Sequence, residues 1–158
     1  MGTLCAIYFS NVEGVENPDL RIIDESVNEK WKGVILGGDQ FLVSDEMLID
    51  HLSKKAGAAV FLGFQSVVDA FQFVLAKDDR IVRKLVYGCF QNEREWEVVE
   101  GEEQEWEEVV FFETEYDEDW DEEFDEFVSP LVGSSSPGID ARNTCEEIAE
   151  FYDLPGWD

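Results

Sequence analysis

Short apolar runs separated by polar turns fill most of the first ninety residues, and this pattern predicts β-strands. The runs that predict strands are 4–9, 34–36, 41–43, 58–64, 71–76 and 81–87. Two polar stretches, 37–40 and 77–80, have the composition of hairpin turns between such strands. Residues 11–28 contain Gly14, Pro18 and many polar groups, and they are expected to form a long loop.

Two further stretches alternate strictly between polar and apolar residues. Residues 95–98 do so, and so does the stretch 106–111, with Gly101 in the turn between them. Such alternation is typical of antiparallel strands that pack one face on the core and leave the other in water. The strands together predict a mainly antiparallel sheet of about six or seven members.

Three stretches show the spacing of apolar residues expected of a helix. One begins at residue 44 or 45 and ends at about 56, with Gly57 as its C-terminal stop. Another begins at Asp140 or Asn143 and ends at 154–156. The third is predicted by an aromatic stripe formed by Tyr116, Trp120, Phe124 and Phe127.

The helix predicted over 116–127 carries acidic residues almost everywhere except on its aromatic face. Like charges four residues apart repel, and this stretch contains no Lys or Arg to offset them. The aromatic face would therefore have to pack on another element for a helix to persist.

These elements predict an α+β fold in which about three helices pack on the sheet. The chain has 158 residues, the length of one ordinary domain, so residues 1–158 are expected to form a single domain. Residues 133–138 are rich in glycine and serine and are expected to act as a linker.

Charge is distributed very unevenly along the chain. The net charge is -27 at pH 7, and the stretch 91–128 alone contains 19 acidic residues and one arginine. An excess of acid argues against direct binding to nucleic acid or to an anionic membrane, because both select Lys and Arg. We call 91–128 the acidic segment, and its charge indicates a surface for a cationic partner.

Catalytic chemistry has little support in the residues present. His51 is the only histidine, so any Ser-His-Asp triad would have to use it, and a multi-histidine metal site is excluded. Cys5, Cys89 and Cys145 are odd in number and far apart, so we predict reduced core thiols.

One carboxylate spacing is that of a calcium loop. Asp117, Asp119 and Asp121 match the opening of such a loop, but its sixth and twelfth positions are Glu122 and Val128 instead of Gly and Glu. We therefore predict no metal, no cofactor and no enzymatic activity.

The chain begins without the basic and apolar regions of a secretory signal, and it has no apolar run of about 18 residues that could cross a bilayer. A cytoplasmic location is therefore expected.

The leading hypothesis is a non-enzymatic acidic protein that blocks a basic surface of its partner. Carboxylates held on a folded frame can imitate the phosphate rows of DNA, so the expected partner is a DNA-binding protein, a nuclease or a toxin. In charge, length and lack of catalytic motifs the chain resembles DNA-mimic inhibitors and immunity proteins in general. The expected contact face consists of Glu105, Glu107, Glu108, Glu115, Asp117, Asp119, Asp121, Glu122 and Asp125, with Trp106 and Trp120 as aromatic anchors if they are exposed.

An alternative hypothesis belongs to a different class of protein. It is a small α+β domain with a ligand or enzymatic site among its strands, whose acidic residues serve solubility alone. A large apolar pocket near 37–64, with a carboxylate of shifted pKa, would favour it.

Overall fold

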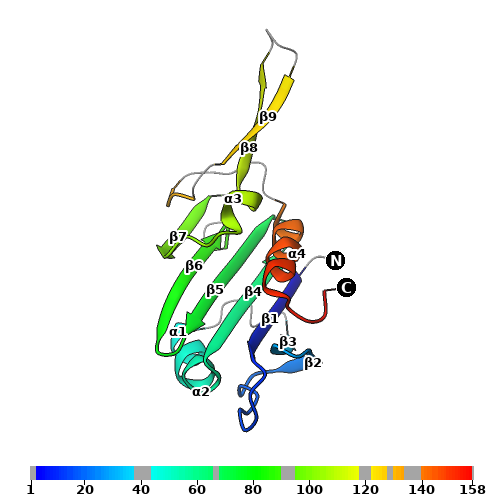
Figure 1. Cartoon of the computed structure of the whole chain (residues 1–158), viewed down its shortest axis with the longest axis vertical. Helices are drawn as coiled ribbons and strands as arrows, with labels where there is room; N and C mark the ends of the chain where they lie inside the picture. Colours follow the sequence, from blue (N-terminus) through cyan, green and yellow to red (C-terminus); the bar gives the residue numbers. More distant parts are fainter. Residues whose placement is uncertain are drawn as a thin grey trace.

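The computed structural model of the chain describes residues 3–37, 44–65, 68–89, 95–117, 122–127, 130–133 and 140–157, with the backbone alone for 3, 112–117 and 122–127. Within these ranges seven strands form one antiparallel sheet in the order β2-β3-β1-β4-β5-β6-β7, and helices lie against it (Figure 1). The predicted α+β class is confirmed. No helix among the described residues is long and apolar enough to cross a membrane.

Most strands of the sheet coincide with stretches that the sequence predicts to be strands. They are β1 (Thr3–Ser10), β2 (Ile22–Val27), β3 (Trp31–Leu36), β4 (Ala58–Gln65), β5 (Ala70–Lys77), β6 (Arg80–Tyr87) and β7 (Trp96–Gly101). The centre of the sheet is a meander in which β4 pairs with β5 and β5 with β6, through a tight turn at Asp78 that has a φ of 52°. The predicted turn at 37–40 and strand at 41–43 lie outside the described residues, apart from Gly37.

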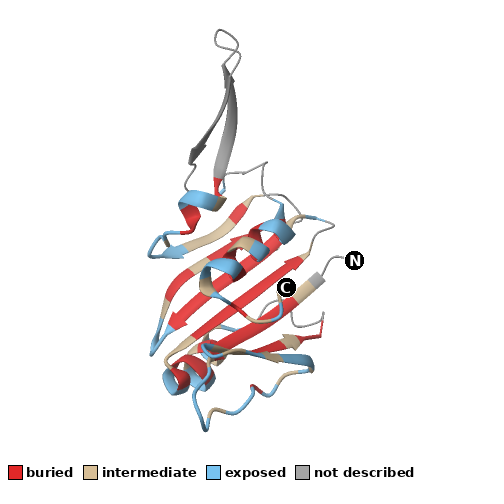
Figure 2. Cartoon of the chain, turned by 45° about the vertical axis from the view of Figure 1, so that its right-hand side comes forward, coloured by how far each residue is buried: buried red, intermediate tan, exposed pale blue. Residues whose placement is uncertain are grey.

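Two apolar clusters cover the two faces of this sheet. On one face, alternate residues of β4, β5 and β6 pack against α4 (Ala141–Tyr152), which lies across the strands in Figure 2. On the other face, β1, β3 and β4 pack against a helical segment made of α1 (Asp45–Met47), η2 (Leu48–Ser53) and α2 (Lys54–Ala56). Leu48 and Leu52 of that segment are fully buried, as their spacing predicts.

Both helical segments begin where the sequence predicts a cap. The Ser44 hydroxyl accepts a hydrogen bond from the Met47 amide at 3.3 Å, and an Asp140 carboxylate oxygen accepts one from the Asn143 amide at 3.1 Å. These side chains satisfy amides that a helix leaves without partners in its first turn.

Three sequence predictions are wrong. Residues 11–28 are not all loop, because β2 forms the edge of the sheet; its mostly exposed side chains leave no apolar run to reveal it. The stretch 106–111 is not a strand, because α3 (Glu107–Val110) forms there around a buried ion pair.

The predicted helix over 116–127 is also wrong. The described backbone is two antiparallel strands, β8 (Phe112–Asp117) and β9 (Glu122–Phe127), which form a second sheet of their own. An extended chain advances about 3.3 Å per residue and a helix about 1.5 Å. Strands therefore spread this density of negative charge over a longer backbone than a helix does.

Gly101 is the glycine that the fold constrains most tightly, because it ends β7 against β6. Its φ is +87°, and a Cβ there would lie 2.0 Å from the carbonyl oxygen of Val82. Gly14 has a φ of +89° with open space around it.

We expect Gly101→Ala to lower the free energy of unfolding by more than about 2 kcal/mol. Gly14→Ala should lower it by about 1 kcal/mol, through backbone strain alone. Urea unfolding of both variants measures the difference. Equal losses of unfolding free energy would show that the close contact with Val82 does not add to the backbone strain.

Candidate functional site

A buried ion pair fixes α3 on the sheet. The Arg83 guanidinium on β6 donates to both carboxylate oxygens of Glu107, at 3.0 Å from Nε and 2.6 Å from Nη2. Glu107 is fully buried, and it also accepts a hydrogen bond from the Gln104 amide at 2.7 Å. Arg83 Nη1 donates to the Gly101 carbonyl at 3.2 Å. Because both charges are paired and hydrogen-bonded, this bidentate contact can exist in the interior.

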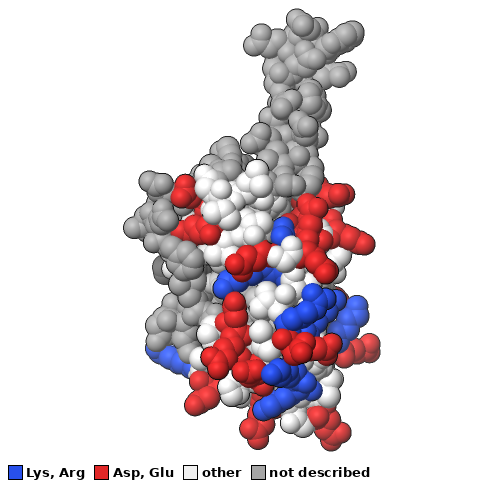
Figure 3. Space-filling model, turned by 90° about the vertical axis from the view of Figure 1, so that its left-hand side faces the viewer, with Lys and Arg blue, Asp and Glu red and all other residues white. Residues whose placement is uncertain are grey.

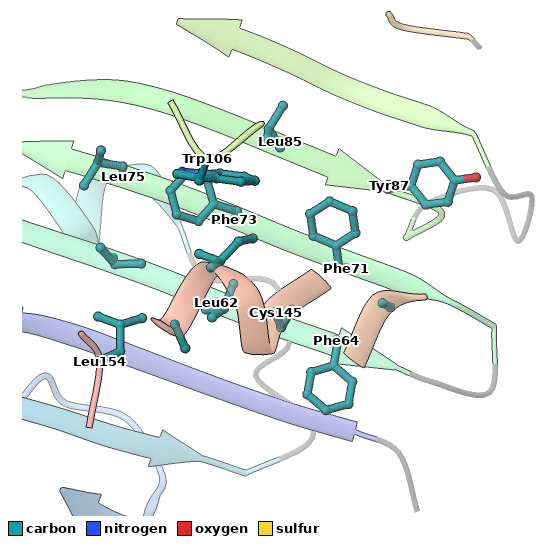
Figure 4. Close-up of a cluster of buried hydrophobic side chains, with 14 of the residues drawn as sticks. Leu62, Phe64, Phe71, Phe73, Leu75, Leu85, Tyr87, Trp106, Cys145 and Leu154 are labelled. Atoms are coloured by element: carbon teal, nitrogen blue, oxygen red, sulfur yellow. The ribbon is translucent and has the colours of Figure 1, made fainter. Parts of the chain in front are cut away.

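The residue before α3 joins the core and reaches α4. Trp106 is 2 % exposed and lies edge-on to Phe73 (Figure 4), and the centroids of the two rings are 5.2 Å apart. Its indole Nε1 donates to the Tyr152 hydroxyl at 2.9 Å, and that hydroxyl donates to the Gln104 side-chain oxygen at 3.3 Å. The two helices are therefore held at a fixed separation by ring packing and by hydrogen bonds.

A groove of about 540 Å³ lies between the two helices. Trp106 and Val110 contribute apolar surface that is buried or partly buried, whereas Val109 of α3 and Phe151 of α4 are exposed. Three glutamates complete the lining: Glu105, Glu147 and Glu150. We call this the α3–α4 groove. It combines an apolar floor with an anionic rim.

The glutamates of the groove form no ion pair with any described residue. Partial burial raises the pKa of Glu147, and the neighbouring negative charge of Glu150 raises it further. Six ion pairs are found among the described residues, and none of them includes a glutamate of the groove. A cation brought to this rim would therefore meet negative charge that is not already neutralised.

An adjacent stripe of α4, which shares Glu150 with the groove, carries further acid. A hollow of about 560 Å³ is lined there by Glu146, Glu150 and Asp153 together with Trp157. Elsewhere the charges are mixed: Figure 3 shows an edge of the molecule on which Lys and Arg side chains alternate with Asp and Glu. Lys84 with Asp45 and Lys54 with Asp50 are examples of such pairs. Negative charge thus predominates around α3 and α4 more than around the first helical segment.

Two members of the predicted contact face are not on the surface. Glu107 is fully buried in its pair with Arg83, and Trp106 is buried in the core, so neither is available to a partner. Their neighbours Glu105 and Glu108 are exposed. The structure describes only the backbone of Glu115 and Asp117 on β8 and of Glu122 and Asp125 on β9, and Asp119, Trp120 and Asp121 lie outside the described residues.

Sequence reasoning missed the contribution of α4 to this surface. Glu147, Glu150 and Phe151 lie within a helix that the sequence predicts, but nothing local indicates that they face α3. Their acidic spacing on the side away from Cys145 and Ile148 was the available signal.

Metal and thiol chemistry find no support in the described part of the chain. No group of three or more His, Cys, Asp or Glu side chains within it is placed to hold a metal ion. Burial raises the pKa of Cys5 and of Cys89 to about 12, and that of Cys145 well above its ordinary value, so all three thiols are protonated at neutral pH. All three cysteines are free in this structure.

Comparisons with protein families, curated proteins and solved structures return no match for this chain.

Because of the buried pair, two adjacent glutamates should differ sharply in their contribution to the free energy of unfolding. We expect Glu107→Ala to lower the free energy of unfolding by about 3–5 kcal/mol, because it leaves the Arg83 charge buried without a partner. Glu108→Ala, one residue away and exposed, should change it by less than about 0.5 kcal/mol. Urea unfolding followed by tryptophan fluorescence measures both. Small and equal effects would contradict the anchoring role of the pair.

The raised pKa of Glu147 predicts that this residue lowers the stability of the fold in a pH-dependent way. The native state favours the protonated carboxyl, so ionisation of Glu147 lowers stability above the ordinary glutamate pKa of about 4.3, and the cost disappears when both states are protonated. Glu147→Gln should therefore raise the unfolding temperature at pH 7 and leave it unchanged near pH 3.

Glu103→Gln, at an exposed position, is the control for the general effect of removing one negative charge. The Glu147 variant should be stabilised more than this control at pH 7. Equal shifts in unfolding temperature would show that total charge alone is responsible.

Proposed function

We propose that this protein is a non-enzymatic, cytoplasmic acidic protein that binds a basic surface of a partner protein and blocks it, in the manner of a DNA mimic or an immunity protein. The observation that carries the proposal is the junction of the acidic segment with the α3–α4 groove. There the charge of the segment meets a rim of glutamates that no described cation neutralises.

The exposed carboxylates lead into the groove along the chain. Glu102, Glu103, Glu105 and Glu108 are exposed around the start of α3, and the strongly acidic strands β8 and β9 follow. A surface of this charge accelerates encounter with a basic groove and makes the association sensitive to salt. The natural target of such a surface is one shaped to hold phosphates, as on a nuclease or a DNA-binding protein.

The alternative hypothesis gains nothing specific from the described residues. A hollow that includes His51 and Lys55 has a volume of about 300 Å³, and charged or polar residues such as Glu16 and Asp19 share its lining with Pro18 and Met47. It is not the large apolar pocket that would favour a ligand or enzymatic site. A solubilising role for the acid is therefore an outcome of the following test.

Two variants with equal charge separate a specific surface from total charge. One replaces six carboxylates of the acidic segment with amides: Glu105, Glu108, Glu115, Asp117, Glu122 and Asp125. The other replaces six exposed carboxylates near β2: Glu13, Glu16, Asp19, Asp24, Glu25 and Glu29. Both keep all the described ion pairs.

Each variant and the unmodified protein are used to capture basic proteins from a native lysate at about 0.05 M and about 0.5 M salt. We expect the unmodified protein and the β2 variant to retain the same basic partner at low salt and to release it at high salt, because screening shortens the range of surface charges. The acidic-segment variant should lose that partner while its circular dichroism is unchanged. Equal retention by both variants, or equal loss, would contradict the proposal.

A further inference from the structure

The walls of the α3–α4 groove are unusually apolar for an exposed surface. Val109 is 71 % exposed and Phe151 is 49 % exposed, and they line the same groove from different helices. Single exposed apolar side chains are normal, but a paired set that lines one groove is typical of a binding surface. Solubility alone does not require such residues, so they need an explanation that the acidic segment does not provide.

The rim restricts what can cover these walls. Glu105 lies just before α3, whereas Glu147 and Glu150 lie on α4, so carboxylates line the groove on both of its sides. An apolar occupant without cations would bury these charges without partners, which is costly. A second copy of this chain would bring more glutamates against them. Charge complementarity therefore selects an occupant with apolar and basic side chains together.

The secondary structure of the occupant follows from the elements beside the groove. Both are helices, whose internal backbone groups are already hydrogen-bonded along their own axes. They offer no free strand edge to pair with an extended segment. A helix satisfies its own backbone, and docking of an amphipathic helix in a groove is an established mode of recognition.

We propose that the α3–α4 groove docks a basic amphipathic helix of the partner, with apolar side chains between Val109 and Phe151 and flanking Lys or Arg side chains on Glu105, Glu147 and Glu150. This inference deepens the proposed function and rests on it for the basic character of the partner. The groove has a volume of about 540 Å³ and presents Val109 and Phe151 to the apolar face of such a helix, as helix-in-groove recognition requires. The fixed contact between Trp106 and Tyr152 means that the groove exists before the helix arrives, which lowers the ordering cost of binding.

The probe for this proposal is a fluorescein-labelled helical peptide about four turns long, with two leucines one turn apart and arginines beside them. Its comparison peptide has the same composition, with the leucines on opposite faces of the helix. Fluorescence anisotropy measures binding of each to the full chain at several salt concentrations. We expect the amphipathic peptide to bind about tenfold more tightly than the comparison peptide.

Matched pairs of variants test the two parts of the groove. Val109→Ser with Phe151→Ser should weaken the amphipathic peptide about tenfold, whereas Ile23→Ser with Val27→Ser, at two exposed apolar residues of β2, should leave it unchanged. Glu147→Gln with Glu150→Gln should weaken binding and reduce its dependence on salt. Glu25→Gln with Glu29→Gln, at two exposed positions, should do neither.

The outcomes distinguish this inference from the function on which it rests. If both peptides bind equally and the Val109 and Phe151 variant has no effect, the groove is not a helix-docking site, although salt-sensitive capture of a basic partner would leave the proposed function standing. Failure of the amphipathic peptide to bind at low salt also overturns the inference. Retention of the partner by the acidic-segment variant overturns the function itself.

Discussion

The architecture around the candidate site depends on one buried ion pair. Arg83 and Glu107 join β6, the strand next to the β7 edge of the sheet, to a helix of only four residues, which could not persist in water by itself. The pair is bidentate, and further bonds to the Gln104 amide and the Gly101 carbonyl use its remaining hydrogen-bonding capacity. Removal of either charge would leave the other buried without a partner, so structures in which α3 leaves the sheet are strongly disfavoured.

The consequences of the pair reach the surface. By placing α3, it places Trp106 over Phe73 and brings its indole to the Tyr152 hydroxyl at the end of α4. The separation of α3 and α4, and hence the groove between them, is a product of this packing. One acidic residue of the segment is used inside the molecule, and its exposed neighbours are left to face solvent. In this account the acidic segment has both a structural and an interactive part.

The sequence was most informative where burial is continuous. Apolar runs such as 58–64 and 71–76 predicted the central strands because a strand covered on both faces must be apolar throughout. The aromatic stripe over 116–127 misled because a spacing of four residues fits one face of a helix and also alternate positions of a strand. Repulsion between the closely spaced carboxylates, which are visible in the sequence, favours an extended backbone over a helix.

The candidate site was only partly predictable for a related reason. Nothing around Glu107 distinguishes it from Glu108, because the partner that buries it lies on a strand 24 residues away in sequence. Likewise, α4 was predicted from its own apolar face, but its contact with α3 depends on the tertiary structure and has no local signal in the sequence. The acidic segment could be located from charge alone, whereas the exposed apolar walls of the groove could not.

Hydrogen exchange at α3 tests the central claim most directly. The amides of Val110 and Phe111 donate to the carbonyls of Trp106 and Glu107 at 3.1 and 2.9 Å. If the buried pair makes α3 part of the core, these amides will exchange as slowly as the amides of β5 and β6, because all of them exchange only when the whole domain unfolds. Exchange near the rate of an unstructured peptide, with the sheet still protected, would show that α3 is not fixed and that the groove is not a preformed surface.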